Sequence, residues 1–105
     1  MRIRKEQRIF SPETEIIAKA SDALAHPLRV EMFQYIYKEN MDRRKPCTKN
    51  LVEQFGYSQS TISQHMNALT SSGLVEVIKE KSFSYYYVNI GMLGKYLDAV
   101  KRINQ

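Results

Sequence analysis

Residues Tyr57 to Val75 read YSQSTISQHMNALTSSGLV, and this stretch decides the fold of the chain. Its good apolar anchors are Ile62, Met66 and Leu69. They recur at i, i+4 and i+7, which predicts a helix over about 58–70 with one buried stripe, capped by Ser58. Residues 58–73 carry no charged side chain, although exposed helix faces usually carry Lys, Glu or Arg, which are better helix formers than Ser or Thr. The polar face of this helix therefore needs an explanation beyond contact with water.

A short helix precedes this one and makes the pair a helix-turn-helix. Residues 48–55, TKNLVEQF, place three apolar side chains on one face, and Thr48 is in position to cap the start. Gly56 supplies the left-handed residue that ends such a helix. Two helices separated only by residues 56–58 have the spacing of a helix-turn-helix.

The second helix of such a motif enters the major groove of DNA, where its exposed side chains meet base edges. Gln can both donate to and accept from adenine, and Ser and Thr can serve in either role. Gln59 and Ser63 are one turn apart, as are Ser60 and Gln64, so the four side chains form two adjacent exposed strips. We interpret this face as a base-reading surface, and the alternative is a face that only solvates the helix.

The rest of the chain predicts three more helices and a β-hairpin. Ser11-Pro12 places a hydroxyl cap before a proline at the first helical position, and His26-Pro27 ends that helix because the residue before proline avoids helical geometry. The predicted elements, in order, are helices over about 12–25, 27–38, 48–55 and 58–70, a hairpin over 74–90 whose strands are separated by Lys79–Ser82, and a closing helix over 91–103. The fold class is α+β, mainly α: a winged helix-turn-helix with four helices, a β-hairpin wing and a C-terminal helix.

Length and composition favour one DNA-binding domain over residues 1–105. The 105 residues carry a net charge of +5 and a pI near 9.4, which favours a polyanionic partner such as double-stranded DNA. No apolar run approaches the roughly 20 residues that span a bilayer, so we expect no membrane partner. The basic arm over 1–10 lacks the apolar core of a secretion signal, and a single cysteine fits a reducing cytoplasm.

The hairpin supplies the positive charge that the helix over 58–70 lacks. Lys79 and Lys81 flank its tip, where they can contact phosphates and provide affinity without sequence information. The alternative is that these lysines protect a sheet edge against aggregation. Residues Tyr85 to Tyr87 must point alternately to opposite faces of a strand, so we expect them to pack rather than to stack on bases.

Three segments resemble a known family. SDALAHPLRVEMFQYI, LVEQFGYSQSTISQHMNALTSSGLVE and IKEKSFSYYYVN are similar, over Ser21 to Asn89, to the ArsR-type winged helix-turn-helix repressors of bacteria. The resemblance implies a homodimer, built through the outer helices, that binds an inverted-repeat operator and responds to a signal. The chain itself identifies no inducer.

The resemblance also implies which residues meet DNA. By position, the residues on the recognition helix are Ser58, Gln59, Ser60, Thr61, Ser63, Gln64 and His65. Those on the wing are Lys79, Lys81 and Ser82. Family members often place Gly and then Arg at the tip of the wing, where this chain has Lys81 and Ser82.

The metal-sensing residues of the family are largely missing. Many members bind a soft metal through a Cys-x-Cys pair, but Cys47-Thr48-Lys49 keeps only the first cysteine. A second family site uses Asp, Glu and His on the last helix, which here offers only Asp98. We therefore expect no metal and no cofactor. Cys47 lies between Lys45 and Lys49 near a helix start, surroundings that permit redox sensing, although a structural role is the favoured interpretation.

Catalysis is not expected. The four glycines are scattered and form no phosphate-cradling loop, and no nucleophile stands beside an oriented base. A winged helix used only for protein contact is the alternative function, but it would present an apolar recognition face. Membrane-surface binding through the arm would leave the rest unexplained. The sequence therefore predicts a homodimeric, sequence-specific DNA-binding repressor.

Overall fold

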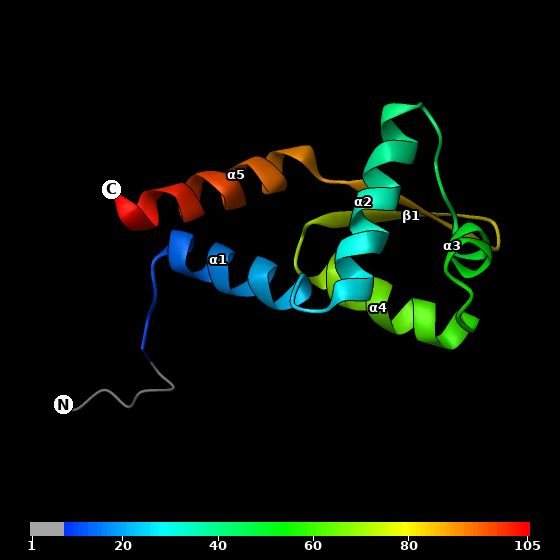
Figure 1. The fold of residues 1–105 in the computed structure, drawn as a ribbon, viewed down its shortest axis with the longest axis horizontal. Coiled ribbons are helices and arrows are strands. Elements are labelled where there is room, and N and C mark those ends of the chain that lie inside the picture. Colours follow the sequence, from blue (N-terminus) through cyan, green and yellow to red (C-terminus); the bar gives the residue numbers. More distant parts are fainter. Residues whose placement is uncertain (1–7) are drawn as a thin grey trace.

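The structure, a computed structural model, describes residues 8–105 and has the expected order of elements (Figure 1). The helices and strands are α1 (Pro12–Ala23), α2 (Pro27–Met41), α3 (Thr48–Phe55), α4 (Gln59–Ser71), β1 (Val75–Glu80), β2 (Phe83–Val88) and α5 (Ile90–Lys101), with a short 3-10 turn (Arg102–Asn104) at the end. The two strands form an antiparallel hairpin. The predicted fold class, a mainly helical winged helix-turn-helix, is confirmed.

Most helices begin at the residues whose side chains can cap them. The Ser11 and Ser58 hydroxyls accept from the backbone N–H groups three residues ahead, as predicted. The prediction that Thr48 caps α3 is wrong, because Cys47 holds the capping position. The Asn50 carboxamide accepts from the Cys47 backbone N–H at 2.8 Å and from its thiol at 3.2 Å. Thr48 instead shares a 3.0 Å hydrogen bond with the buried Tyr86 hydroxyl.

α2 extends three residues beyond its predicted end at Lys38, and the Asn40 side chain explains the extension. Its carboxamide oxygen accepts from the Val88 backbone N–H at 2.8 Å. Its nitrogen donates to the carbonyl oxygens of Arg44 and Tyr86. A side chain from the last turn of α2 therefore fixes both β2 and the chain that leaves the helix.

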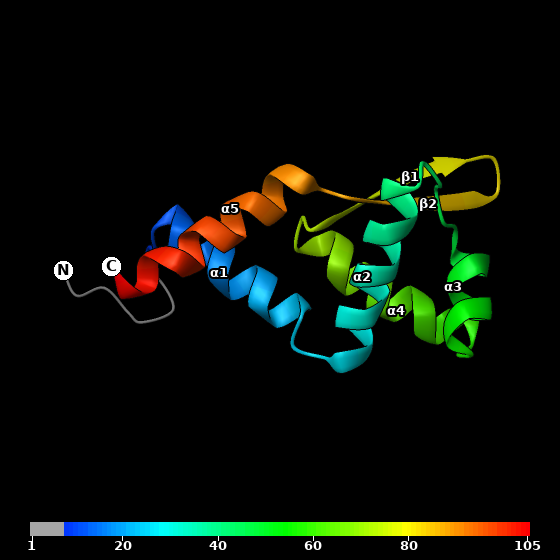
Figure 2. The ribbon, with the colours of Figure 1, turned by 45° about the horizontal axis from the view of Figure 1, so that its top comes forward.

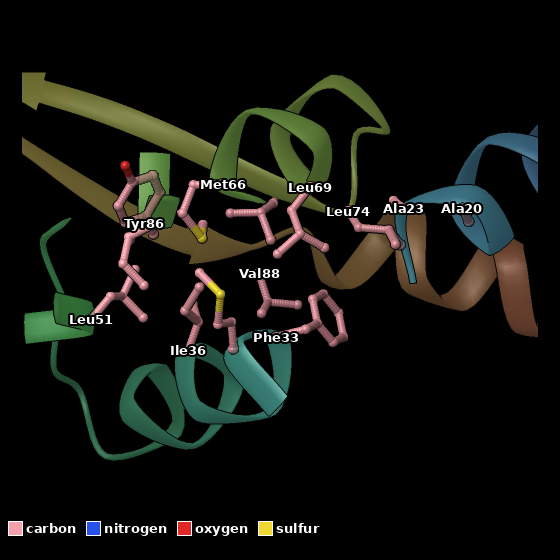
Figure 3. Packing of buried hydrophobic residues seen from close by; sticks show 13 residues of the cluster. Ala20, Ala23, Phe33, Ile36, Leu51, Met66, Leu69, Leu74, Tyr86 and Val88 are labelled. Atoms are coloured by element: carbon pink, nitrogen blue, oxygen red, sulfur yellow. The ribbon is translucent and has the colours of Figure 1, made fainter. Parts of the chain in front are cut away.

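One hydrophobic core joins α4 to α2, α3 and the hairpin (Figure 3). The three apolar anchors of α4 are at most 1% exposed. Burying one such side chain stabilises the fold by about 1.5–3 kcal/mol. Tyr86 is also buried in this core, so the prediction that the tyrosines pack is confirmed there. The core holds α4 along one stripe and leaves the opposite face of the helix free.

α1 and α5 lie side by side at one end of the molecule, away from α3 and the hairpin (Figures 1 and 2). The Ser21 and Tyr96 hydroxyls join the two helices through a 3.1 Å hydrogen bond, and Arg102 pairs with Glu13. The molecule is elongated, 52 × 28 × 26 Å, with a radius of gyration of 15.8 Å, against about 13 Å for a compact domain of 100 residues. The elongation leaves a long helical surface at that end.

Candidate nucleic-acid interface

The exposed face of α4 carries an uncharged polar strip directly opposite its buried anchors. The residues of this outer strip are Ser60, Gln64, Asn67 and Ser71. They recur at i, i+4, i+7 and i+11 and are all exposed, as the helical period requires. Asn67 was not among the DNA contacts predicted from the sequence. The helical period counted from the three anchors could have identified it.

The start of α4 is a closed cluster of hydroxyls. The Ser58 hydroxyl accepts from the Thr61 backbone N–H at 3.2 Å and donates to the Thr61 hydroxyl at 3.0 Å. The Ser60 hydroxyl lies 3.2 Å from that of Ser58. Ser58 and Thr61 thus hold the helix start in place, and their predicted contact with DNA stays a prediction.

A groove runs between the start of α3, one side of α4 and the inner face of the hairpin. Its volume is about 540 Å³. Gln59 and Ser63 line it from α4, together with Asn67 of the outer strip, whereas Ser60 and Gln64 do not, so the two predicted strips of α4 face different surroundings. Lys49 and Lys79 line it from α3 and β1, and no Asp or Glu is among the described residues around it. The groove is therefore polar and positively charged.

The wing separates its charges between two faces. The strands extend to Glu80 and resume at Phe83, so the turn is shorter than the predicted separator and consists of Lys81 and Ser82. On the outer face the Lys45 ammonium pairs with Glu80 at 3.3 Å and lies 4.3 Å from the centre of the Tyr85 ring. Among residues 8–105, no carboxylate lies within ion-pair distance of Lys79 or Lys81.

At the tip of the wing, Lys81 occupies the position where ArsR-type proteins often have glycine. Lys81 has a φ of 56°, the left-handed conformation that glycine adopts without strain. An L-residue in this region costs about 1–2 kcal/mol. The tight turn is therefore retained, and it presents a lysine ammonium at its tip.

His65 lies on the side of α4 that faces α2. Its Nδ1 accepts from the Arg29 Nε at 3.2 Å, and the centre of its ring lies 4.8 Å from that of His26. Burial, followed by the nearby His26 and Arg29, lowers the pKa of His65 below its ordinary 6.5. His65 is half-buried, unlike the outer strip, and its predicted contact with DNA stays a prediction. No local pattern in the sequence pointed to Arg29 as its partner.

The remaining candidates fall outside this surface or at its edge. Cys47 lines the groove but is buried, with its thiol hydrogen-bonded to Asn50.

Within the described part of the chain, no three His, Cys, Asp or Glu side chains are grouped as metal ligands would be. No helix of residues 8–105 is long and apolar enough to cross a membrane. Most of the basic arm, residues 1–7, lies outside the described residues.

Comparisons with known proteins agree with this geometry. Residues 24–78 match a family model described as a helix-turn-helix domain. Nodulation protein NolR of Rhizobium meliloti is 30% identical over 91 residues, 87% of this chain and 70% of that protein. A solved ArsR-like transcriptional regulator from Rhodococcus sp. RHA1 superposes with a TM-score of 0.71 at 26% identity, covering 87% of this chain and 80% of that one. The chain belongs to the ArsR-type winged helix-turn-helix regulators.

A solved NolR structure has a similar architecture. The crystal structure of NolR from Sinorhizobium fredii superposes with a TM-score of 0.64 at 28% identity, covering 91% of this chain and 95% of that one. Membership of this family makes the chain a DNA-binding transcriptional regulator and not an enzyme.

Proposed function

We propose that this ArsR-type regulator is a homodimeric repressor that binds an inverted-repeat operator through α4 and the wing. The observation that carries the proposal is the uncharged polar strip on α4 beside a groove that, among residues 8–105, is lined by two lysines and no carboxylate. Base edges in the major groove require neutral donors and acceptors, while the backbone requires positive charge. The two requirements are met by neighbouring surfaces.

Base reading is assigned to polar side chains in the first three turns of α4. Gln64 and Asn67 on the outer strip can each bond bidentately to adenine, and Ser60 can donate or accept. Gln59 and Ser63, which line the groove, are assigned the same role from that side of α4. Each good bidentate contact is worth about 1–3 kcal/mol of discrimination against the wrong base.

The DNA backbone is assigned to the groove between α4 and the wing. Lys79 lines it from β1, and Lys49 lines it from the first turn of α3. Ser82 lines the groove from the turn of the hairpin, and Lys81 precedes it in that turn. Lys49 was not predicted as a DNA contact, because the sequence does not show that the hairpin folds back over the start of α3.

Dimerisation is assigned to the outer helices and the segment that precedes them. Among the apolar side chains exposed there are Ile9, Phe10, Ile90, Leu97, Val100 and Ile103. Leu97 is 50% exposed and Ile103 68% exposed, a poor arrangement for a monomer in water. A dimer would cover them and would present two copies of α4, which an operator-specific protein needs because one short helix makes few base contacts. This role places the protein in the cytoplasm with the chromosome.

Selection of bound sites from random DNA duplexes tests the proposal. We expect an enriched palindrome whose half-sites are one helical turn apart, and sedimentation of the free protein as a dimer at micromolar concentration. A selection that enriches no motif would contradict sequence-specific binding and favour a winged helix used for protein contact. A monomer in sedimentation would contradict the role of the outer helices.

A further inference from the structure

Arg29 connects three helices at one point. Its Nε donates to His65 Nδ1 of α4 at 3.2 Å, and its Nη1 donates to the carbonyl oxygen of Ala23, the last residue of α1, at 3.5 Å. Arg29 itself belongs to the first turn of α2. One guanidinium group therefore links the end of an outer helix to the side of the recognition helix.

The link requires His65 to be unprotonated at Nδ1. A nitrogen that accepts from Arg29 must present a lone pair, whereas a histidine cation carries hydrogen on both ring nitrogens. The neighbouring His26 ring caps α2, because its Nδ1 accepts from the Leu28 backbone N–H at 3.1 Å. A proton on His65 Nδ1 would face the Arg29 N–H and break the hydrogen bond.

Among residues 8–105, no nearby group would offset the positive charge of a protonated His65. The groups that face it are Arg29 of α2 and His26 at the start of that helix. α4 carries no other titratable side chain, and α1 contributes the Ala23 carbonyl through Arg29. Within residues 8–105, no carboxylate lies at ion-pair distance from either His65 or Arg29.

We propose that Arg29 is a positioning residue for α4, and that protonation of His65 releases the helix and weakens operator binding. The link to DNA rests on the proposed function. We call the two hydrogen bonds of Arg29, to His65 Nδ1 and to the Ala23 carbonyl oxygen, the clamp. The clamp fixes the side of α4 that neither the apolar core nor the groove holds. Mild acid should therefore change the orientation of α4 relative to the rest of the domain.

The direction of the pH effect distinguishes this proposal from direct electrostatic attraction between a protonated His65 and DNA. The folded protein holds the pKa of His65 below its ordinary value of 6.5. The stabilisation from neutral His65 is thus complete above about pH 6.5 and is lost as pH falls through the folded pKa. A cation that only approached DNA would strengthen binding in acid, whereas release of the clamp weakens it.

The matched variant is His65→Asn, because the asparagine Oδ1 can accept from Arg29 without titrating. The dissociation constant for a selected duplex is measured by fluorescence anisotropy at pH 7.5 and pH 5.5, at fixed ionic strength. We expect the acid-to-neutral ratio of the wild type to exceed that of His65→Asn by about threefold or more. Arg29→Lys keeps the positive charge but loses the separate Nε and Nη1 donors to His65 and to the Ala23 carbonyl oxygen. This variant should remove the same pH dependence. Equal ratios in the wild type and His65→Asn, or a smaller wild-type ratio, would overturn the proposal.

A measurement without DNA tests the clamp by itself. The free energy of unfolding in urea is determined for the wild type and His65→Asn between pH 7.5 and pH 5.5, with circular dichroism to confirm that both are folded. We expect the wild type alone to lose the stabilisation contributed by neutral His65. Equal unfolding profiles would overturn the clamp itself. Failure to bind any duplex would overturn the proposed function and its link to pH, but it would leave the unfolding comparison unaffected.

Discussion

Replacing Lys79 with alanine should reduce the salt dependence of DNA binding by a calculable amount. Lys79 lines the groove from β1, and its ammonium has no carboxylate partner in the described chain. Its sequence neighbour Glu80 lies on the other face of the hairpin, where it pairs with Lys45. The full charge of Lys79 is thus available to a phosphate.

The magnitude follows from counterion release. Each phosphate that a protein neutralises contributes about 0.9 to the slope of log K against log salt concentration. A dimer presents two copies of Lys79, so Lys79→Ala should make the slope shallower by about 1.8. The ratio of the wild-type association constant to that of the variant should therefore be about 12-fold smaller at 200 mM salt than at 50 mM salt. Fluorescence anisotropy titrations of one labelled duplex at four salt concentrations measure this.

Lys38→Ala is the matched control, because Lys38 is an exposed lysine of α2 that does not line the groove. It removes the same charge from the chain and should leave the slope within about 0.5 of the wild-type value, since the slope counts neutralised phosphates. Equal slopes for the wild type and Lys79→Ala would refute the assignment of the DNA backbone to this groove.

Three further substitutions test separate parts of the structure. Ser58→Ala removes the cap that accepts from the Thr61 N–H and should lower the free energy of unfolding by about 1 kcal/mol, which corresponds to about 4–8 °C in Tm; an unchanged Tm would contradict the cap. Lys81→Gly relieves the left-handed φ of 56° and should raise the free energy of unfolding by up to about 1 kcal/mol, while DNA affinity at low salt falls. Leu97→Asp places a charge on the half-exposed outer surface of α5 and should sediment as a monomer with unchanged circular dichroism; a stable dimer would move the interface elsewhere.

The fold could be predicted because its signals are local. Ser58, the three anchors of α4 and Gly56 lie within one short stretch, and helical period and capping act over a few residues. The errors occur where a distant residue takes over a local role. Thr48 is a good cap by its chemistry, but its hydroxyl is used by Tyr86 from β2, and the end of α2 depends on contacts of Asn40 with that same strand.

The candidate site divides in the same way. The outer strip follows from the helical period alone, so Ser60 and Gln64 could be selected from the sequence. Lys49 joins Lys79 only because the hairpin folds over α3. His65 was grouped with its sequence neighbours, but its surroundings come from Arg29, 36 residues earlier in the chain. Residue type and spacing therefore predict which side chains can contact DNA, and packing determines which of them are free to do so.

The central claim is that the polar strip of α4 reads base edges, and site selection with wild type and Gln64→Ala in parallel tests it most directly. The wild type should enrich a palindrome, and the variant should enrich the same palindrome with the preference lost at one symmetry-related pair of positions. Discrimination there should fall by about 1–3 kcal/mol. An identical motif from both proteins, with affinity lowered equally on every duplex, would contradict base reading by α4.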